Sequence, residues 1–429
     1  MSLEIITLIV LLAMFIIGSV ISVNMGVLGI VAAFIVGTYV SGLSLDDLYA
    51  AFPVDMFILL AGVTYLFAIA LNNGTLDMII SGGLKLVKGN VGLLPWVLFF
   101  LSALLSAVGA STVAVGPILF PIALRLAYQH KINPILMGTL ISTGMYAGSF
   151  SPLNIFGLVV NGIMESEKIP HSPIMLFINC FIFYVLISLV VFFAFGGLRL
   201  LKHRTGAELQ MAAATEGGAG AVNAKTENNE STWYKIATLF GIGLLITLAI
   251  GFDMNMGFGA LMIGLVLALM APKNQADIIK QMPWGVMLMV TGIMTYVGVM
   301  EKVGTMEFMT DQIASIGNPV LASLMASYVG GVISAFASTT GFLAAVIPLS
   351  APILQDPTMS AIGVVSALSI AASVVDISPF STNGALIMAN VQGVNERLFF
   401  RKLLMIAGLF IALGPGLAWL LFVLIGTPW

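Results

Sequence analysis

The sequence has 429 residues, of which 59% are hydrophobic and only 8% are charged. About a quarter of the residues in a soluble domain are charged, so this composition excludes a soluble domain. It predicts an all-α polytopic membrane protein. The net charge of −3 gives no basis for nucleic-acid binding, and the single cysteine, Cys180, excludes a disulfide or a thiolate metal cluster within the chain.

Apolar stretches long enough to cross a bilayer recur along the chain, because a hydrocarbon core of about 30 Å needs about 20 residues of helix. We predict such spans at 3–22, 25–42, 54–72, 133–163 and 174–198, and again at 234–252, 257–271, 283–300, 358–391 and 403–426. Residues 205–232, between these two sets, are rich in Gly, Ala and polar residues and lack apolar periodicity. This composition predicts a flexible linker.

Two further apolar regions, 93–128 and 319–354, are interrupted in the middle by small and polar residues. Each is thereby divided into pieces of about 16 residues, which are short for a membrane span. We therefore predict that each region is a re-entrant helical hairpin. The spans 133–163 and 358–391 are also interrupted, and we predict a broken helix in each.

The two halves of the chain, 1–204 and 233–429, resemble each other. Residues 52–77 align with residues 282–307 without a gap, at an offset of 230. The sequences that begin at Ser151 and Ser378 share Ser, Pro and Gly at an offset of 227. Because each half has five crossings, the second half enters the membrane upside down relative to the first. The pattern predicts an inverted-topology repeat, which is common among secondary transporters.

The positive residues predict the orientation. If each hairpin returns to its own side, one side of the membrane has only Lys168 and Lys302 among the 16 Lys and Arg residues. The positive-inside rule then makes the linker side cytoplasmic and places both termini outside. We expect a multi-pass protein of the cell inner (cytoplasmic) membrane.

The helix breaks, at 109–112, 148–154, 337–341 and 376–384, predict one shared polar site, since non-helical backbone at membrane depth must be enclosed by protein or line a wet cavity. Half-helix N-termini suit an anion, and unwound carbonyls with Ser, Thr and Asn oxygens suit a hard cation such as sodium. A single such break would be explained better by close packing of small residues between helices. The symmetric positions of all the breaks favour a binding site.

Asp376 is the one ionisable residue in the middle of the later spans, and an acid at this depth predicts a cation ligand or a proton carrier. The alternative is a structural carboxylate bonded to Ser378 or Ser381. Its repeat mate is Ser149. Because no Lys or Arg lies in the breaks, a bound anion would need accompanying cations, which favours cation-coupled symport.

The runs "NMGVLGIVAAFIVGTYVSG", "FPVDMFILLAGVTYLF" and "NNGTLD" resemble the N-terminal region of the MatC-type dicarboxylate carriers, in the ion-transporter superfamily that includes the divalent anion/sodium symporters. The resemblance implies a homodimer, in which a scaffold domain holds an elevator-like transport domain made of the hairpins and broken helices. It also implies a carboxylate- and sodium-binding Ser-Asn-Thr motif at each hairpin tip. Here Ser111-Thr112-Val113 and Ser338-Thr339-Thr340 occupy those positions, with Thr in place of Asn.

By this resemblance, one cation site lies between Ser111 and loop 148–154, the other lies between Ser338 and loop 376–384, and the substrate lies between the tips. The predicted partners are a small dicarboxylate, malonate or a C4-dicarboxylate, and the lipid bilayer. We expect Na+ or H+ as the coupling ion and no cofactor. The predicted substrate-binding residues are Ser111, Thr112, Asn154, Thr339, Thr340, Ser381, Thr382 and Asn383. The predicted cation-binding residues are Ser111, Gly148, Ser149, Ser151, Ser338, Thr339, Asp376 and Ser378.

Other functional classes fit the sequence less well. His130, His171 and His203 all fall in loops, which argues against an intramembrane Ser-His enzyme, and no P-loop motif is present for direct use of ATP. A cation/proton antiporter or an arsenite-type inorganic anion exporter of the same superfamily is a nearer alternative, because of Asp376. A channel is a third possibility, but hairpins that close a midplane site favour alternating access.

Overall fold

The computed structural model describes residues 2–21, 23–84, 91–202, 231–252, 254–271, 275–316, 318–334, 339–379 and 381–426. All regular structure in these residues is helical, which confirms the predicted all-helical architecture. The predicted linker, 205–232, lies almost entirely outside the described residues.

The helices of the first half follow the predicted spans closely, with additional short helices between them. They are α1 (Leu3–Val20), α2 (Met25–Phe34) with its π-helical continuation η1 (Ile35–Val40), α3 (Leu45–Ala50), α4 (Val54–Asn72), α5 (Thr75–Leu84), η3 (Val91–Leu93), α6 (Leu94–Ala107), α7 (Thr112–Gln129), α8 (Pro134–Ser149), α9 (Ile155–Ser166), α10 (Pro173–Ala194) and α11 (Gly197–Lys202).

Among its described residues, the second half has a similar succession of long and short helices, with α19 in addition and without counterparts of η3 and α11. They are α12 (Thr232–Phe252), α13 (Met256–Met270), α14 (Gln275–Gln281), α15 (Trp284–Lys302), α16 (Thr305–Ile316), α17 (Pro319–Ser334), α18 (Thr339–Leu349), α19 (Ala351–Leu354), α20 (Ala361–Ser373), α21 (Thr382–Asn390) and α22 (Glu396–Trp419), which continues as the π-helical η4 (Leu420–Leu424).

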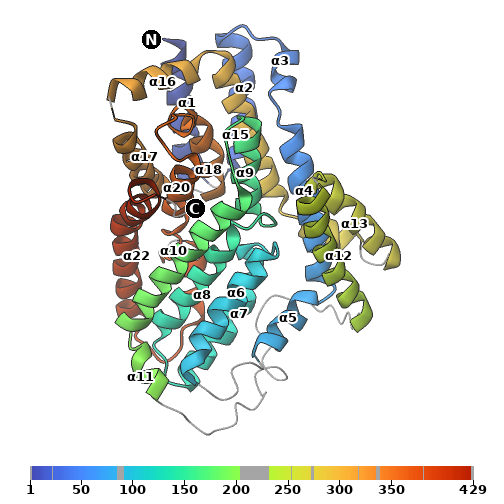
Figure 1. The fold of residues 1–429 in the computed structure, drawn as a ribbon, viewed down its shortest axis with the longest axis vertical. Coiled ribbons are helices and arrows are strands. Elements are labelled where there is room, and N and C mark those ends of the chain that lie inside the picture. The colour runs from blue at the N-terminus through green and yellow to red at the C-terminus, as the bar shows by residue number, and fades with distance from the viewer. Residues whose placement is uncertain are drawn as a thin grey trace.

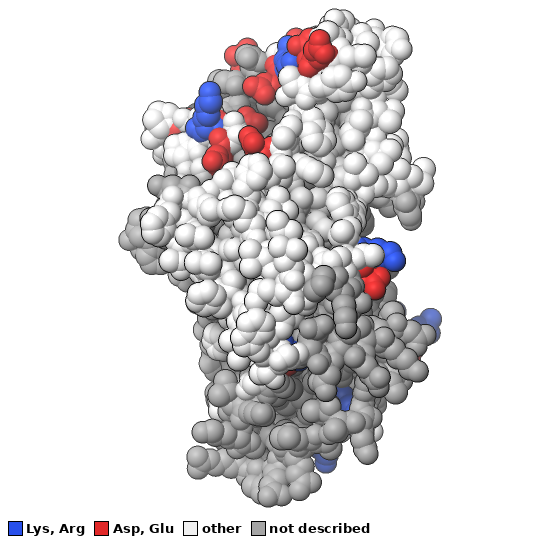
Figure 2. Space-filling view, turned by 90° about the vertical axis from the view of Figure 1, so that its right-hand side faces the viewer, with Lys and Arg blue, Asp and Glu red and all other residues white. Residues whose placement is uncertain are grey.

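Five helices among the described residues are long and apolar enough to cross a membrane, namely α4, α7, α10, α15 and α22 together with η4. Most of the other apolar helices have 10–17 residues. The space-filling view shows a broad band of uncharged surface below the charged side chains at the upper end of the molecule (Figure 2). These features are those of a multi-pass membrane protein.

The two predicted hairpins differ in the length of their limbs. In the first, α6 has 14 residues and α7 has 18, so that α7 reaches spanning length by itself. In the second, α17 has 16 residues and α18 has 11. The expected limbs of about 16 residues are therefore not uniform, and the re-entrant course of the hairpins stays a prediction.

Glycines bring helices of the two halves into backbone contact at two equivalent crossings. Where α2 crosses α15, a Cβ atom on Gly292 would lie 2.1 Å from the carbonyl oxygen of Gly26. Where α4 crosses α13, a Cβ atom on Gly62 would also lie 2.1 Å from a carbonyl oxygen, that of Gly257. Gly62 aligns with Gly292, and Gly26 with Gly257, so both crossings use equivalent residues. Small residues permit this close approach between membrane helices.

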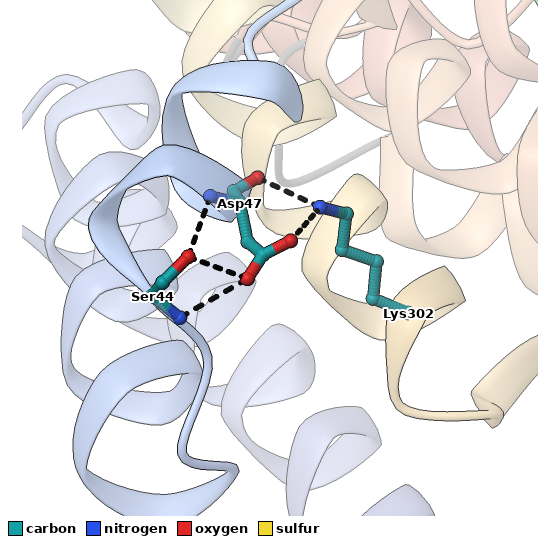
Figure 3. A network of polar contacts seen from close by, with 3 residues as sticks. All are labelled: Ser44, Asp47 and Lys302. Atoms are coloured by element: carbon teal, nitrogen blue, oxygen red, sulfur yellow. Dashed lines mark hydrogen bonds and ion pairs between the residues drawn. The ribbon is translucent and has the colours of Figure 1, made fainter.

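The ends of helices from the two halves are also joined by polar contacts. At one end of the molecule, the Lys302 ammonium group on α15 donates to Asp47 Oδ1 (2.8 Å) and to the Asp47 carbonyl oxygen (3.1 Å) on α3 (Figure 3). The other carboxylate oxygen of Asp47 accepts from Ser44, the residue that caps α3. In the interior, the Thr7 and Thr305 hydroxyls lie 2.8 Å apart and join α1 to α16.

Candidate binding site at the helix breaks

Three of the predicted breaks fall within the described residues, except for Phe380 in the break at 376–384, and each is followed by a capped half-helix. Ser111 precedes α7 and its hydroxyl accepts from the Ala114 amide, whereas Asn154 precedes α9 and Ser381 precedes α21. All three caps have extended backbone, so the helix stops and restarts at these positions. The fourth break lies between α17 and α18 and includes Ser338, which is outside the described residues.

In the first half, the broken-helix loop holds the end of the first hairpin limb. The Asn154 amide donates to the carbonyl oxygens of Ser106 (2.8 Å) and Ala110 (3.0 Å). The Ser151 hydroxyl donates to the carbonyl oxygen of Ala107. Carbonyl oxygens at and just beyond the C-terminal end of α6 lack the full set of helix partners, and these side chains supply donors where water would otherwise be needed.

In the second half, a group of oxygen atoms surrounds the Thr339 hydroxyl. Thr339 donates to Asp376 Oδ2 (2.9 Å) and lies 3.3 Å from the Ala372 carbonyl oxygen. The Ser334 hydroxyl lies 3.2 Å from the Thr339 hydroxyl and donates to the Ala372 carbonyl oxygen (2.6 Å). These atoms come from both limbs of the second hairpin and from the second broken helix. They form a compact all-oxygen cluster with one carboxylate.

The loop of the second broken helix folds back on its own cap. The Ser381 hydroxyl lies 2.6 Å from the Asp376 carbonyl oxygen and 2.8 Å from that of Ser378. One turn later, a Cβ atom on Gly384 would lie only 1.9 Å from the Ser378 carbonyl oxygen. The equivalent pair in the first half, Gly157 and Ser151, has the same geometry at 2.0 Å. Both loops therefore depend on a glycine at this position.

Tyr146 joins the two halves at the centre of the site. Its hydroxyl donates to Asp376 Oδ2 (2.6 Å) and accepts from the Asn383 amide (3.2 Å). Neither Tyr146 nor Ser334 is among the residues that the sequence pattern predicts for the site. Tyr146 lies in α8, a helix whose residues are almost all buried, so no periodic pattern distinguishes it. Its place one turn before the break at Ser149 is the one available signal.

The other predicted residues are placed as follows. Ser149 is buried and its hydroxyl donates to the Met145 carbonyl oxygen of its own helix, so it does not occupy the place of Asp376 in the first half. Gly148 lies against the backbone of α6 at Ala103. Thr340 and Ser378 are buried, Thr112 is half-buried and Thr382 is exposed.

The elements that hold these residues pair across the two halves. Helix α18, which follows the second hairpin tip, packs against α9 of the first broken helix. Helix α7, which follows the first hairpin tip, packs against α21 of the second broken helix. The Leu386 side chain of α21 approaches Gly116 of α7 at this second contact. The structure thus brings residues far apart in the sequence to one place.

The comparisons with known proteins agree with this architecture. Residues 1–149 match the family model of the dicarboxylate carrier protein MatC N-terminus, which confirms the resemblance over that part of the chain. The search of curated proteins finds no match. The fold is similar to the crystal structure of the Alcanivorax borkumensis YdaH transporter, with a TM-score of 0.58 and 14% sequence identity. That alignment covers 88% of this chain and 86% of the other.

The fold defines the class first: the protein is an all-helical multi-pass membrane protein whose fold is similar to that of the YdaH transporter. Within that class, its first 149 residues are similar to the N-terminus of the MatC dicarboxylate carriers.

Proposed function

We propose that the protein is a secondary active transporter that carries a small dicarboxylate, malonate or a C4-dicarboxylate, across the cytoplasmic membrane in symport with sodium or protons. The observation on which this proposal chiefly rests is the match of residues 1–149 to a dicarboxylate carrier family. Support for coupling to a cation comes from the oxygen cluster around Asp376.

The oxygen cluster favours a cation as the second ligand. Asp376, Thr339, Ser334 and the Ala372 carbonyl offer only oxygen atoms, which hard cations prefer. A carboxylate at membrane depth is costly unless it is paired or protonated. The ion pairs among the described residues, Lys280–Asp277 and Lys302–Asp47, do not include Asp376. A cation taken from solution would supply the missing positive charge.

The capped half-helices favour an anionic substrate. Helices α7, α9 and α21 each start at a break, behind Ser111, Asn154 and Ser381. Free amides and the helix dipole at such N-termini attract a carboxylate. A dicarboxylate between the hairpin tips could use the N-termini of both halves, one for each carboxylate group.

We also propose that the halves, 1–204 and 233–429, are inverted relative to each other and that the hairpins move as an elevator against a scaffold. The inversion is supported by the positions of two equivalent helices, with α5 in the lower part of the molecule and α16 at the top (Figure 1). The homodimer, the cytoplasmic position of the linker and the external termini belong to the same proposal. The glycine crossings of α2 with α15 and of α4 with α13 would form the rigid scaffold.

Uptake by proteoliposomes tests the proposal. Labelled malonate, succinate and related dicarboxylates are offered to the purified protein with sodium and pH gradients imposed separately, and we expect uptake under at least one gradient. Asp376→Asn preserves the shape of the side chain and removes its charge. Two opposite unit charges about 4 Å apart attract by about 4 kcal/mol at an effective dielectric constant of about 20, so we expect the apparent cation affinity to fall by at least about 10-fold.

The matched control is Asp55→Asn, in the exposed first turn of α4 and away from the cluster. This variant should behave as the wild type. Absence of uptake for every dicarboxylate under both gradients would refute the proposed function.

A second candidate is cation/proton antiport, or export of an inorganic anion, by the same fold. One observation favours it: Asp376 has no carboxylate counterpart in the first half, where the aligned residue is Ser149 and its hydroxyl bonds within its own helix. The same vesicles distinguish the two functions, because an antiporter would move sodium in response to a proton gradient with no dicarboxylate present.

A further inference from the structure

Tyr146 is held rigidly at the centre of the site. It is 3% exposed and lies in the last turn of α8, one turn before the break of the first broken helix. Its ring stacks on Phe156 of α9, with centroids 6.2 Å apart and an angle of 11°. The Tyr184 ring of α10 lies 6.0 Å away on a second side. Because the ring is confined, the hydroxyl has a fixed position and only its proton can reorient.

The hydroxyl contacts two residues with different predicted roles. It donates to Oδ2 of Asp376, the predicted cation ligand, and accepts from the amide of Asn383, a predicted substrate ligand. Both partners lie in the second half of the chain, whereas Tyr146 lies in the first. Thr339, at the second hairpin tip, donates to the same Asp376 oxygen. The two sites therefore share one hydroxyl group.

We propose that Tyr146 is a positioning residue that couples cation binding at Asp376 to dicarboxylate binding at Asn383, an inference that rests on the proposed function. A hydroxyl that donates to a carboxylate is polarised and becomes a better acceptor for the Asn383 amide. A cation on Asp376 Oδ2 competes for the same lone pairs and weakens the Tyr146 bond. The Asn383 amide is then released toward the substrate, so that each ligand favours the other.

Coupling of this kind is measurable, because it must be equal in both directions. Isothermal titration with malonate and with succinate gives the dissociation constant of the purified wild type in sodium chloride and in choline chloride, and then at several pH values. We expect the favoured cation to tighten dicarboxylate binding by a factor of about 5 to 150. In Tyr146→Phe, the ring and its packing remain, but the hydroxyl group that contacts both Asp376 and Asn383 is removed. In this variant, the favoured cation should change the dissociation constant of the dicarboxylate by a factor close to one.

Tyr184→Phe is the matched control. It removes one hydroxyl from a buried tyrosine of the neighbouring helix, whose partner is Ser373 and not Asp376. We expect this variant to keep the wild-type coupling factor. A merely structural role for Tyr146 predicts a lower melting temperature with an unchanged coupling factor, and that result would overturn the inference. A wild type that binds a dicarboxylate equally well with and without every cation would also overturn it. Failure of the wild type to bind any dicarboxylate would instead refute the proposed function.

Discussion

Gly384 provides the sharpest test of how the second broken helix is built. A methyl group at this position would lie 1.9 Å from the Ser378 carbonyl oxygen and 2.4 Å from its carbon. Ordinary contact begins near 3.4 Å, so Gly384→Ala forces the two backbone segments apart by about 1.5 Å. The obstacle is backbone and not a flexible side chain, so it cannot turn away. Such overpacking costs about 1–3 kcal/mol or more.

The displacement would reach the functional cluster directly. The loop between Ser378 and Gly384 is tied to the Asp376 carbonyl by Ser381, and Asp376 in turn is held by bonds of 2.6 and 2.9 Å. A shift of about 1.5 Å is enough to break hydrogen bonds of this length. We therefore expect Gly384→Ala to lose cation-dependent uptake as well as stability. Gly157→Ala, the equivalent change in the first half, should have a similar effect on stability.

Thermal unfolding in detergent and uptake by proteoliposomes are measured together. The matched control is Gly408→Ala on α22, where a Cβ atom would meet nothing within 4 Å. Since Ala is favoured over Gly within helices by about 0.5–1 kcal/mol, this control should be neutral or slightly stabilising. If Gly384→Ala melts and transports like the wild type, Gly384 does not lie in close contact with the Ser378 carbonyl, and the prediction is wrong.

Two further predictions concern contacts between the halves. Thr7→Val leaves the buried Thr305 hydroxyl without its partner and should lower the free energy of unfolding by about 1 kcal/mol. The double change to Val at both positions should cost less than the sum of the single changes, and strict additivity in this cycle would contradict a direct bond. Lys302 and Ser44 lower the pKa of Asp47 from 3.8 to about 2, so their stabilising effect is present above about pH 4 and lost as the pH falls toward 2. Asp47→Asn should make the melting temperature less dependent on pH in this range. The change should be small because the pair is exposed. An unaltered pH profile would argue against the Lys302 contact.

Part of the site could be predicted from the sequence because membrane depth imposes a strict rule on the backbone. Small and polar residues in apolar runs near 109–112 and 148–154 coincide with the ends of α6 and α8, as expected where helices cannot continue. Asp376 is predicted as a cation ligand for a similar reason, since an isolated acid in a span is costly. Whether Ser111, Thr340 or Thr382 binds substrate stays a prediction.

The sequence by itself determined the helical membrane class and predicts the span positions and two equivalent halves, because hydrophobic length and repeated Gly and Pro positions can be read along the chain. The tertiary structure decided which breaks meet and through which atoms. Tyr146, Asp376 and Asn383 are separated by as many as 237 residues, and only packing brings the first broken helix against the second. A buried aromatic hydroxyl leaves no periodic trace in the sequence, since its importance depends on the partner that the fold places within hydrogen-bonding distance.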